Sequence, residues 1–521
     1  MSQRTEHIDR QVLSNNLQQN LEQIKNLLGN SYDLVIRSFA VGGNNLQVAV
    51  LFISGLENNE AVENIISDLT IKFSPTSTDL KADSTSPSQI FQETQQKIIR
   101  NQELEPVDNL SLLFDQLFLG DTILLIDGIN RGIICNTKQW ELRSLEEPEA
   151  ERVIRGPRDG FIEALPVNTS LLRRRIRTPN LWIESLEIGT VTKTKVAIAY
   201  IKGLAQEGLV NEVRTRLQEI EIDNVIESGV LEEMIEDTFL TPFPLMHRSE
   251  RTDIAMSEIL EGRVAILTDG TPFVLFAPTR LHDMLQGPDD YYEKFPVGSF
   301  IRIGRMLAFV LAIFLPAIYI ATVNFHTELI PSTLLLGITA ARQGVPFPVA
   351  MEVILMEIVF EMLREAGLRL PGMIGPAISI VGALILGEAA IQANLVSPAV
   401  VIVVAATGIA SFVAPSFELN IATRLIRFCM IILGATLGLF GVQFGFILLT
   451  VHLCSLRSFG YPYLAPFAPL IIEDWKDSFI RAPWWWQKKR PHLEGGRDPV
   501  RNKRNKAQTP PSGLDDSDYD S

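Results

Sequence analysis

Between Phe295 and Ile472 the chain contains no lysine and no aspartate. Its charges there are seven glutamates and eight arginines, which leave the stretch close to neutral. Three runs inside it, at 306–327, 389–417 and 428–456, carry no charge at all. Because about 20 apolar helical residues cross a hydrocarbon layer of about 30 Å, these runs predict transmembrane helices. The stretch therefore predicts an all-α polytopic membrane domain, for which we expect the bounds 300–472.

The number of crossings follows from where the two ends lie. An N-terminus without an apolar signal region and a basic segment beginning at Lys488 both predict that the ends face the cytoplasm. An even number of spans is then required, so between four and six are expected. Two arrangements satisfy this requirement. In one, the Gly-rich run at 428–456 forms a tight hairpin that leads into a last span near 442–458. In the other, the domain has four full spans together with embedded half-helices. The apolar residues 329–341 are too short to cross and predict a re-entrant segment. The remaining spans are expected near 306–325, 347–363, 373–395, 397–415 and 421–441.

Charged side chains within this domain are the sharpest indication of function. An ionised group at mid-bilayer costs at least about 3 kcal/mol, so it faces a partner, water or a pore. Glu357, Glu361 and Arg364 share one helical face by their spacing. Either the acids line a cation path, or ion pairs, such as Glu361 with Arg364 or with Arg424 and Arg427, fix helix packing. The candidates for the path or network are Glu352, Glu357, Glu361, Arg364, Glu388 and Glu418.

Small and aromatic residues indicate packing and anchoring in the same domain. Two GxxxG patterns, Gly434–Gly438 and Gly441–Gly445, allow helices to approach closely. Three consecutive tryptophans, Trp484 to Trp486, precede the basic segment and are typical of a membrane interface. We expect residues 473–521 to form an interfacial segment followed by a disordered cytoplasmic tail.

The residues before the membrane domain are acidic and internally repeated. The whole chain of 521 residues has a net charge of −15, and because the membrane stretch and the tail are each slightly positive, about −17 falls on the first 294 residues. An acidic surface argues against a nucleic-acid-binding protein. VAVLFISGL from Val48 matches VAIAYIKGL from Val196, DTILLIDG from Asp121 matches RVAILTDG from Arg263, and RSFAVG from Arg37 matches ESLEIG from Glu184. The ordered matches predict two similar α/β subdomains with helices over mixed short sheets.

These matches suggest a division of the soluble, α+β part into subdomain 1 at residues 1–145 and subdomain 2 at 146–295. Between them an Arg-rich linker at 147–177 stands out in an acidic domain. Its arginines are expected to form ion pairs between lobes or subunits, or else to contact anionic headgroups or an acidic partner. The candidate interface residues are Arg155, Arg158, Arg173, Arg174 and Arg175.

Residue patterns for catalysis or metal binding are absent from the sequence. GxGxxG, P-loop, GxSxG and HExxH motifs do not occur, and three distant cysteines exclude a CxxC site. The nearest approach to a site is His326 with Glu328, for which a water-facing loop is the simpler interpretation. We therefore expect no enzyme activity, no cofactor and no metal.

From Arg152 to Pro469, about 60% of its length, the chain resembles the A subunit of the GerA family of spore germination receptors. The strings that carry the resemblance are RGPRDGF (155–161), RRRI (173–176), PFP (242–244), LEGRVAILTDGTPF (260–273), FHTELIP (325–331), GVPFP (344–348), LREAGLRLP (363–371), IVGALILG (380–387), HLCSLRSFG (452–460) and PYLAP (462–466).

The resemblance implies a place and a role. Such subunits lie in the spore inner membrane with a transporter-like B subunit and a lipoprotein C subunit, and couple a nutrient to cation release and germination. The A subunit of this family is thought to form a homo-oligomer that conducts ions or relays the signal. In the family pattern the position of Glu388 is often Gln, that of Gln392 often Glu, and that of Gln343 usually Glu. This departure makes Glu388 a weaker pore candidate than Glu357 or Glu361.

Overall fold

The computed structural model describes residues 11–41, 45–72, 87–95, 104–139, 148, 151, 153, 155–369, 375–491 and 500–501. The predicted disordered tail beyond Arg501 lies outside the described residues. Contacts divide the chain into two compact units. The first contains residues 1–236, 246–278 and 483–521, and the second contains 237–245 and 279–482.

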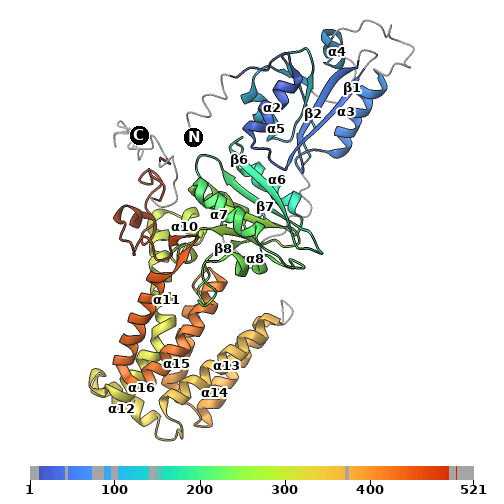
Figure 1. Ribbon diagram of the computed structural model, residues 1–521. Coiled ribbons are helices and arrows are strands. Elements are labelled where there is room, and N and C mark those ends of the chain that lie inside the picture. Colours follow the sequence, from blue (N-terminus) through green and yellow to red (C-terminus); the bar gives the residue numbers. More distant parts are fainter. Residues whose placement is uncertain are drawn as a thin grey trace, which may run out of the picture. The chain divides into compact units, whose positions relative to one another are not determined.

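The first unit holds two lobes, each built on one five-stranded sheet (Figure 1). In lobe 1 the strand order is β1-β2-β4-β5-β3, and in lobe 2 it is β6-β7-β9-β10-β8. The elements of lobe 1 are α2 (Leu17–Leu27), β1 (Leu34–Val41), β2 (Leu46–Ile53), α3 (Asn59–Lys72), α4 (Pro87–Glu93), β3 (Leu104–Val107), α5 (Leu110–Leu117), β4 (Thr122–Ile126) and β5 (Gly132–Cys135). Those of lobe 2 are α6 (Leu165–Arg175), β6 (Leu181–Ile188), β7 (Thr194–Ile201), α7 (Glu207–Gln218), α8 (Ser228–Ile235), β8 (His247–Ser249), α9 (Thr252–Glu261), β9 (Val264–Thr268) and β10 (Val274–Ala277).

The two lobes repeat each other down to single hydrogen bonds, as the sequence predicts. The backbone N–H of Leu17 donates to Asp127 at 3.0 Å, and that of Leu165 donates to Asp269 at the same distance. The backbone of Ser54 donates to the carbonyl of Asp33 at 2.8 Å, as Lys202 does to Asn180. The two similar α/β subdomains are thereby confirmed.

The expectation of mixed sheets is wrong. Every pair of named strands in both sheets is antiparallel. Successive strands such as β4 and β5 are joined by the Asp127–Gly128 turn, whose Gly128 has a φ of +85°. Because short turns reverse the chain, they join antiparallel strands, whereas parallel neighbours need a long crossover.

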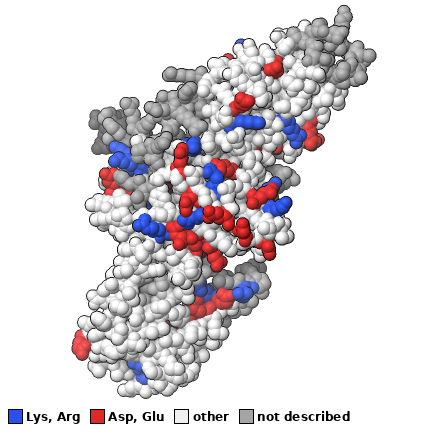
Figure 2. All heavy atoms as spheres, in the orientation of Figure 1, with Lys and Arg blue, Asp and Glu red and all other residues white. Residues whose placement is uncertain are grey.

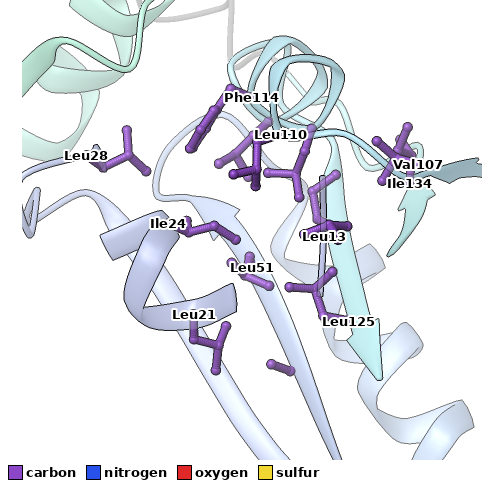
Figure 3. Close-up of a cluster of buried hydrophobic side chains, with 14 of the residues drawn as sticks. Leu13, Leu21, Ile24, Leu28, Leu51, Val107, Leu110, Phe114, Leu125 and Ile134 are labelled. Carbon is purple, nitrogen blue, oxygen red and sulfur yellow. The ribbon is translucent and has the colours of Figure 1, made fainter. Parts of the chain in front are cut away.

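Each sheet of the first unit buries apolar residues against its helices. In lobe 1, Leu51 and Leu125 from the sheet meet Ile24 from α2 and Phe114 from α5 (Figure 3). Lobe 2 has a corresponding cluster formed by α6, α9 and the sheet. In β6 the buried residues Leu181 and Ile183 alternate with half-buried ones, whereas in β1 only Val41 is buried.

The second unit is helical and apolar on its surface. Figure 2 shows mostly uncharged residues over the part that contains α11 to α16. Among the described residues, α11 and α16 are long and apolar enough to cross a membrane. The short helix α12 has no buried residue, and α15 is apolar but too short to meet the same criterion. The helices are α10 (Asp289–Tyr292), α11 (Phe295–Phe325), α12 (Ser332–Ala341), α13 (Val349–Arg369), α14 (Gly375–Gln392), α15 (Pro398–Phe412) and α16 (Phe417–Ser455).

Helix α16 is a helical hairpin rather than a single rod. Its Gly438 has non-helical torsion angles, with φ +63° and ψ −146°. Beyond it the chain folds back, because a Cβ on Gly445 would lie 2.5 Å from the sulfur of Met430. In a straight helix these two residues would be more than 20 Å apart, at about 1.5 Å per residue. The reversal falls in the Gly-rich run where the sequence suggests a tight hairpin.

The C-terminal segment packs within the first unit. Arg490 donates from Nε to the carbonyl of Leu260 at 2.9 Å, and the Arg501 guanidinium lies 3.6 Å from the carboxylate of Glu261. Arg501 also stacks over the ring of Trp484, 5.6 Å from its centroid. An interfacial role for the three tryptophans stays a prediction.

Candidate functional site

The carboxylate of Glu357 is buried against an arginine from α16. Its Oε2 accepts a hydrogen bond from Arg427 Nη1 at 2.7 Å, and the two side chains are 0% and 1% exposed. The pair joins α13 to the first arm of the hairpin. Glu357 Oε1 and the Nε and Nη2 of Arg427 have no hydrogen-bond partner among the described residues. The pair is therefore buried with part of its hydrogen-bonding capacity unused.

One turn further along α13, Glu361 meets two arginines. Its Oε2 accepts from Arg364 Nη2 at 2.6 Å and from Arg424 Nη1 at 3.1 Å. Together with the Glu357–Arg427 pair, three arginines surround two carboxylates. This local excess of positive charge disfavours a cation beside these acids. The structure thus pairs both acids with arginines, and a cation path beside them stays a prediction.

Glu352 joins three elements at the other end of α13. Its Oε1 accepts from Arg342 Nε at 3.2 Å, and its Oε2 accepts from the backbone N–H of Ser397 at 2.8 Å. Ser397 is the N-cap residue of α15, so the carboxylate lies at the N-terminus of that helix, where its dipole favours negative charge. The sequence alone does not identify Arg342 as the partner of Glu352. The signal that points to it is the presence of an arginine in a stretch that contains no lysine or aspartate.

The other two candidate acids lie apart from this network. Glu388 on α14 is exposed, and its Oε1 accepts a hydrogen bond from the neutral amide of Gln392 at 3.1 Å. Glu418 is half-buried at the start of α16. Glu388 therefore differs from Glu352, Glu357 and Glu361, each of which has an arginine partner in the structure.

The glycines of the two GxxxG patterns lie where the backbone is crowded. A Cβ on Gly434 would lie 2.7 Å from the carbonyl oxygen of Ala317 in α11. Across the hairpin, a Cβ on Gly441 would lie 2.2 Å from the carbonyl oxygen of Leu433, and one on Gly438 would touch Phe325. No larger residue fits these positions without moving a helix.

Arginines of the linker have different surroundings in the first unit. Arg173 is 0% exposed and donates to Asp33 of lobe 1 at 2.6 Å, and to Ser31 at 2.8 Å. Arg175 pairs with Asp159 at 2.5 Å. The remaining candidates are Arg174, which is half-buried, and Arg155 and Arg158, which are exposed.

Among the described residues, no group of three or more His, Cys, Asp or Glu side chains could hold a metal ion. His326 and Glu328 lie at the end of α11, half-buried and exposed respectively.

Residues 22–493 match the family described as Bacillus/Clostridium GerA spore germination protein. The chain belongs to the GerA family. The resemblance based on the sequence strings is thereby confirmed, and with it a role in spore germination as an A-subunit relative.

Curated relatives cover nearly the whole chain. It is 42% identical over 501 residues to spore germination protein KA of Bacillus subtilis, which covers 96% of this chain and 90% of that protein. It is 37% identical to spore germination protein GerLA of Bacillus cereus, covering 95% and 99%. The uncharacterized membrane protein YfkQ of Bacillus subtilis is 41% identical, with coverage of 92% and 91%.

A solved structure also matches part of the chain. It is the crystal structure of the N-terminal domain of the A subunit of the Bacillus megaterium spore germinant receptor GerK3. The identity is 37%, the TM-score is 0.40, and the match covers 51% of this chain and 96% of that one.

Proposed function

We propose that this GerA-family chain is a membrane subunit of a germinant receptor, which assembles as a homo-oligomer and conducts monovalent cations when a nutrient is sensed. The helical unit would lie in the spore inner membrane, with four to six crossings and α12 as a re-entrant segment, and the first unit and the C-terminal segment would lie on the cytoplasmic side. Its partners would be a transporter-like B subunit and a lipoprotein C subunit. A relative named as a membrane protein and the two long apolar helices support the membrane placement.

The observation that supports cation conduction is the surface exposure of the Glu388 side chain. An ionised carboxylate that faces lipid is costly, by about 3 kcal/mol near the bilayer centre. Glu352, Glu357 and Glu361 avoid this cost by pairing with arginine, but Glu388 is exposed and bonded to a neutral amide. The face of α14 that carries Glu388 and Gln392 is therefore expected to meet water or another subunit. We place the cation path along this face and assign a structural role to Glu357 and Glu361.

The test is cation flux into liposomes that contain the full chain with its receptor partners. Glu388→Gln keeps the size and the hydrogen bond to Gln392 but removes the charge, so K⁺ flux should fall several-fold. The matched control is Glu365→Gln on α13, whose carboxylate is exposed and pairs with Arg369. Loss of flux with the control alone, or no flux from the unsubstituted complex, contradicts the proposal.

The alternative is a non-conducting scaffold that relays the signal between receptor subunits. The Glu–Arg pairs that join α13 to other segments, Glu352–Arg342, Glu357–Arg427 and Glu361–Arg424, favour it. It predicts that the receptor complex does not assemble when residues 1–290 are removed. It also predicts that spores whose receptor carries Glu388→Gln germinate normally. Normal germination with Glu388→Gln, at unchanged protein abundance, would therefore replace conduction by the scaffold role.

A further inference from the structure

The two lobes of the first unit dock through different faces. Lobe 2 contributes the outer face of α6, where Ser170 and Arg173 are buried. Lobe 1 contributes the end of its sheet, where Asp33 receives Arg173 and the Arg173 guanidinium lies 5.4 Å from the ring centroid of Phe118. A Cβ on Gly55, just after β2, would lie 3.0 Å from the Cβ of Ser170. The contact is heterologous, because a helix face of one lobe meets a sheet end of the other.

Because the lobes are repeats, each also carries the face that it does not use in this contact. The residues of α2 that correspond to Ser170 and Arg173 of α6 are Glu22 and Lys25, and both are exposed. The helix face that is buried in lobe 2 is therefore exposed in lobe 1, where it carries the same kind of basic side chain near its C-terminal end.

The sheet end of lobe 2 is the other unused face. Gly203 corresponds to Gly55 and has nearly the same φ, +85° against +87°, but among the described residues nothing lies within 4 Å of its Cβ position. Asn180 corresponds to Asp33, and it is 1% exposed. Neither the oxygen nor the nitrogen of the Asn180 amide has a hydrogen-bond partner in the described part of the chain. The position that takes an arginine in lobe 1 thus lacks its donor in lobe 2.

We propose that α2 of a second copy of this chain docks on the sheet end of lobe 2, as α6 docks on lobe 1. Lys25 of the incoming copy lies over Asn180, whose amide is already buried within one copy and becomes accessible as the helix docks, and its Glu22 lies over the open position at Gly203. A neutral Asn in place of Asp makes this contact weaker than the buried ion pair within one chain. Because the contact is heterologous, repeating it joins copies head to tail into a ring or filament. The inference rests on the oligomer of the proposed function and names one of its interfaces.

Disulfide trapping in the full chain tests the docking. Glu22→Cys and Gly203→Cys are combined in a background where the exposed Cys429 and Cys454 are serine. By repeat equivalence with Ser170 and Gly55, the two new Cβ atoms approach closely enough for a disulfide, which needs about 3.5–4.5 Å. Oxidation should give a ladder of covalent multimers that reductant collapses to the monomer. The control pair places the second cysteine at the exposed Val191 and should give only monomer.

A second variant avoids the strained backbone at Gly203. Lys25→Glu reverses the charge at the docking helix and should lower the mass of the solubilised assembly, whereas Lys195→Glu at another exposed site should not. The docking is overturned if the control cysteine pair also gives covalent multimers. It is also overturned if neither cysteine pair gives any. If the mass shows an oligomer that the cysteine pair does not trap, the copies associate elsewhere, and conduction is still testable through Glu388.

Discussion

In the helical unit, some glutamates are buried beside an arginine partner, whereas Glu388 is exposed and has none among the described residues. Removing Arg427 alone would leave Glu357 buried without its partner, which costs about 3–5 kcal/mol in proteins. The same charge at Glu388 has no such dependence, since its partner is an amide. Two glutamates that look alike in sequence therefore differ in what a substitution would change.

A titratable pair in lobe 2 gives a dependence on pH. His247 of β8 lies 3.3 Å from Glu258 of α9, between ring Nδ1 and carboxylate Oε1. Burial lowers the pKa of His247, but the hydrogen bond and charge of Glu258 and the charge of Glu151 outweigh it, so the pKa lies above its ordinary value. Because the folded-state pKa is raised, the pair stabilises the fold fully below about pH 6.5, the unfolded value. That contribution is lost as the pH rises through the folded-state pKa.

We expect the thermal midpoint of the full chain in detergent to fall between pH 6 and pH 8 by more than it does in His247→Gln. Glu258→Gln removes the partner and should flatten the same dependence. Equal pH profiles for the three proteins would show that the pair makes no linked contribution.

At the scale of elements, the hairpin of α16 depends on one backbone conformation. With φ +63° and ψ −146°, Gly438 lies in a region that only glycine occupies readily. We expect Gly438→Ala to destabilise the helical unit by about 1–3 kcal/mol, since the alanine strains the backbone and its Cβ meets Phe325. Thermal unfolding in detergent measures the loss.

The control for this substitution is Gly337→Ala. Gly337 lies within α12, and in the described part of the chain no atom beyond its own stretch of helix comes within 4 Å of its Cβ position. Replacing it removes a helix-disfavouring residue, so the midpoint should stay the same or rise slightly. A midpoint that falls equally in both variants would mean that the reversal does not depend on Gly438.

How far the sequence predicts these elements differs between the two units. Matches such as Val48 with Val196 reveal the repeat because buried strands constrain residue type and spacing. The reversal at Gly438 could be suggested from glycine density alone. Contacts such as Arg173 with Asp33 and Arg342 with Glu352 could not be predicted from the sequence. Hydrophobic periodicity does not encode which charged side chains meet across distant elements.

On the scale of the whole molecule, the C-terminal segment closes the first unit. We expect truncation after Ala482 to expose the carbonyl of Leu260 and to weaken α9, because a hydrogen bond from a charged donor is worth about 1.5–3 kcal/mol. Hydrogen exchange of the full chain and the truncated chain measures this at α9.

Truncation after Arg501 is the matched control, because it keeps Arg490 and Arg501 and should leave the exchange of α9 unchanged. Faster exchange in both truncated chains, or in neither, contradicts a local role for residues 483–501. The predicted domain boundaries themselves stay predictions.

The division into units has a consequence for protein engineering. Residues 237–245 lie between α8 and β8 of lobe 2, yet Phe243 and Leu245 are buried in a core of the helical unit. A chimaera that joins the N-terminal half of one receptor subunit to the C-terminal half of another would therefore transplant this insert without its matching helices. Chimaeras between relatives should fold only when residues 237–245 and 483–501 travel with the unit to which each belongs.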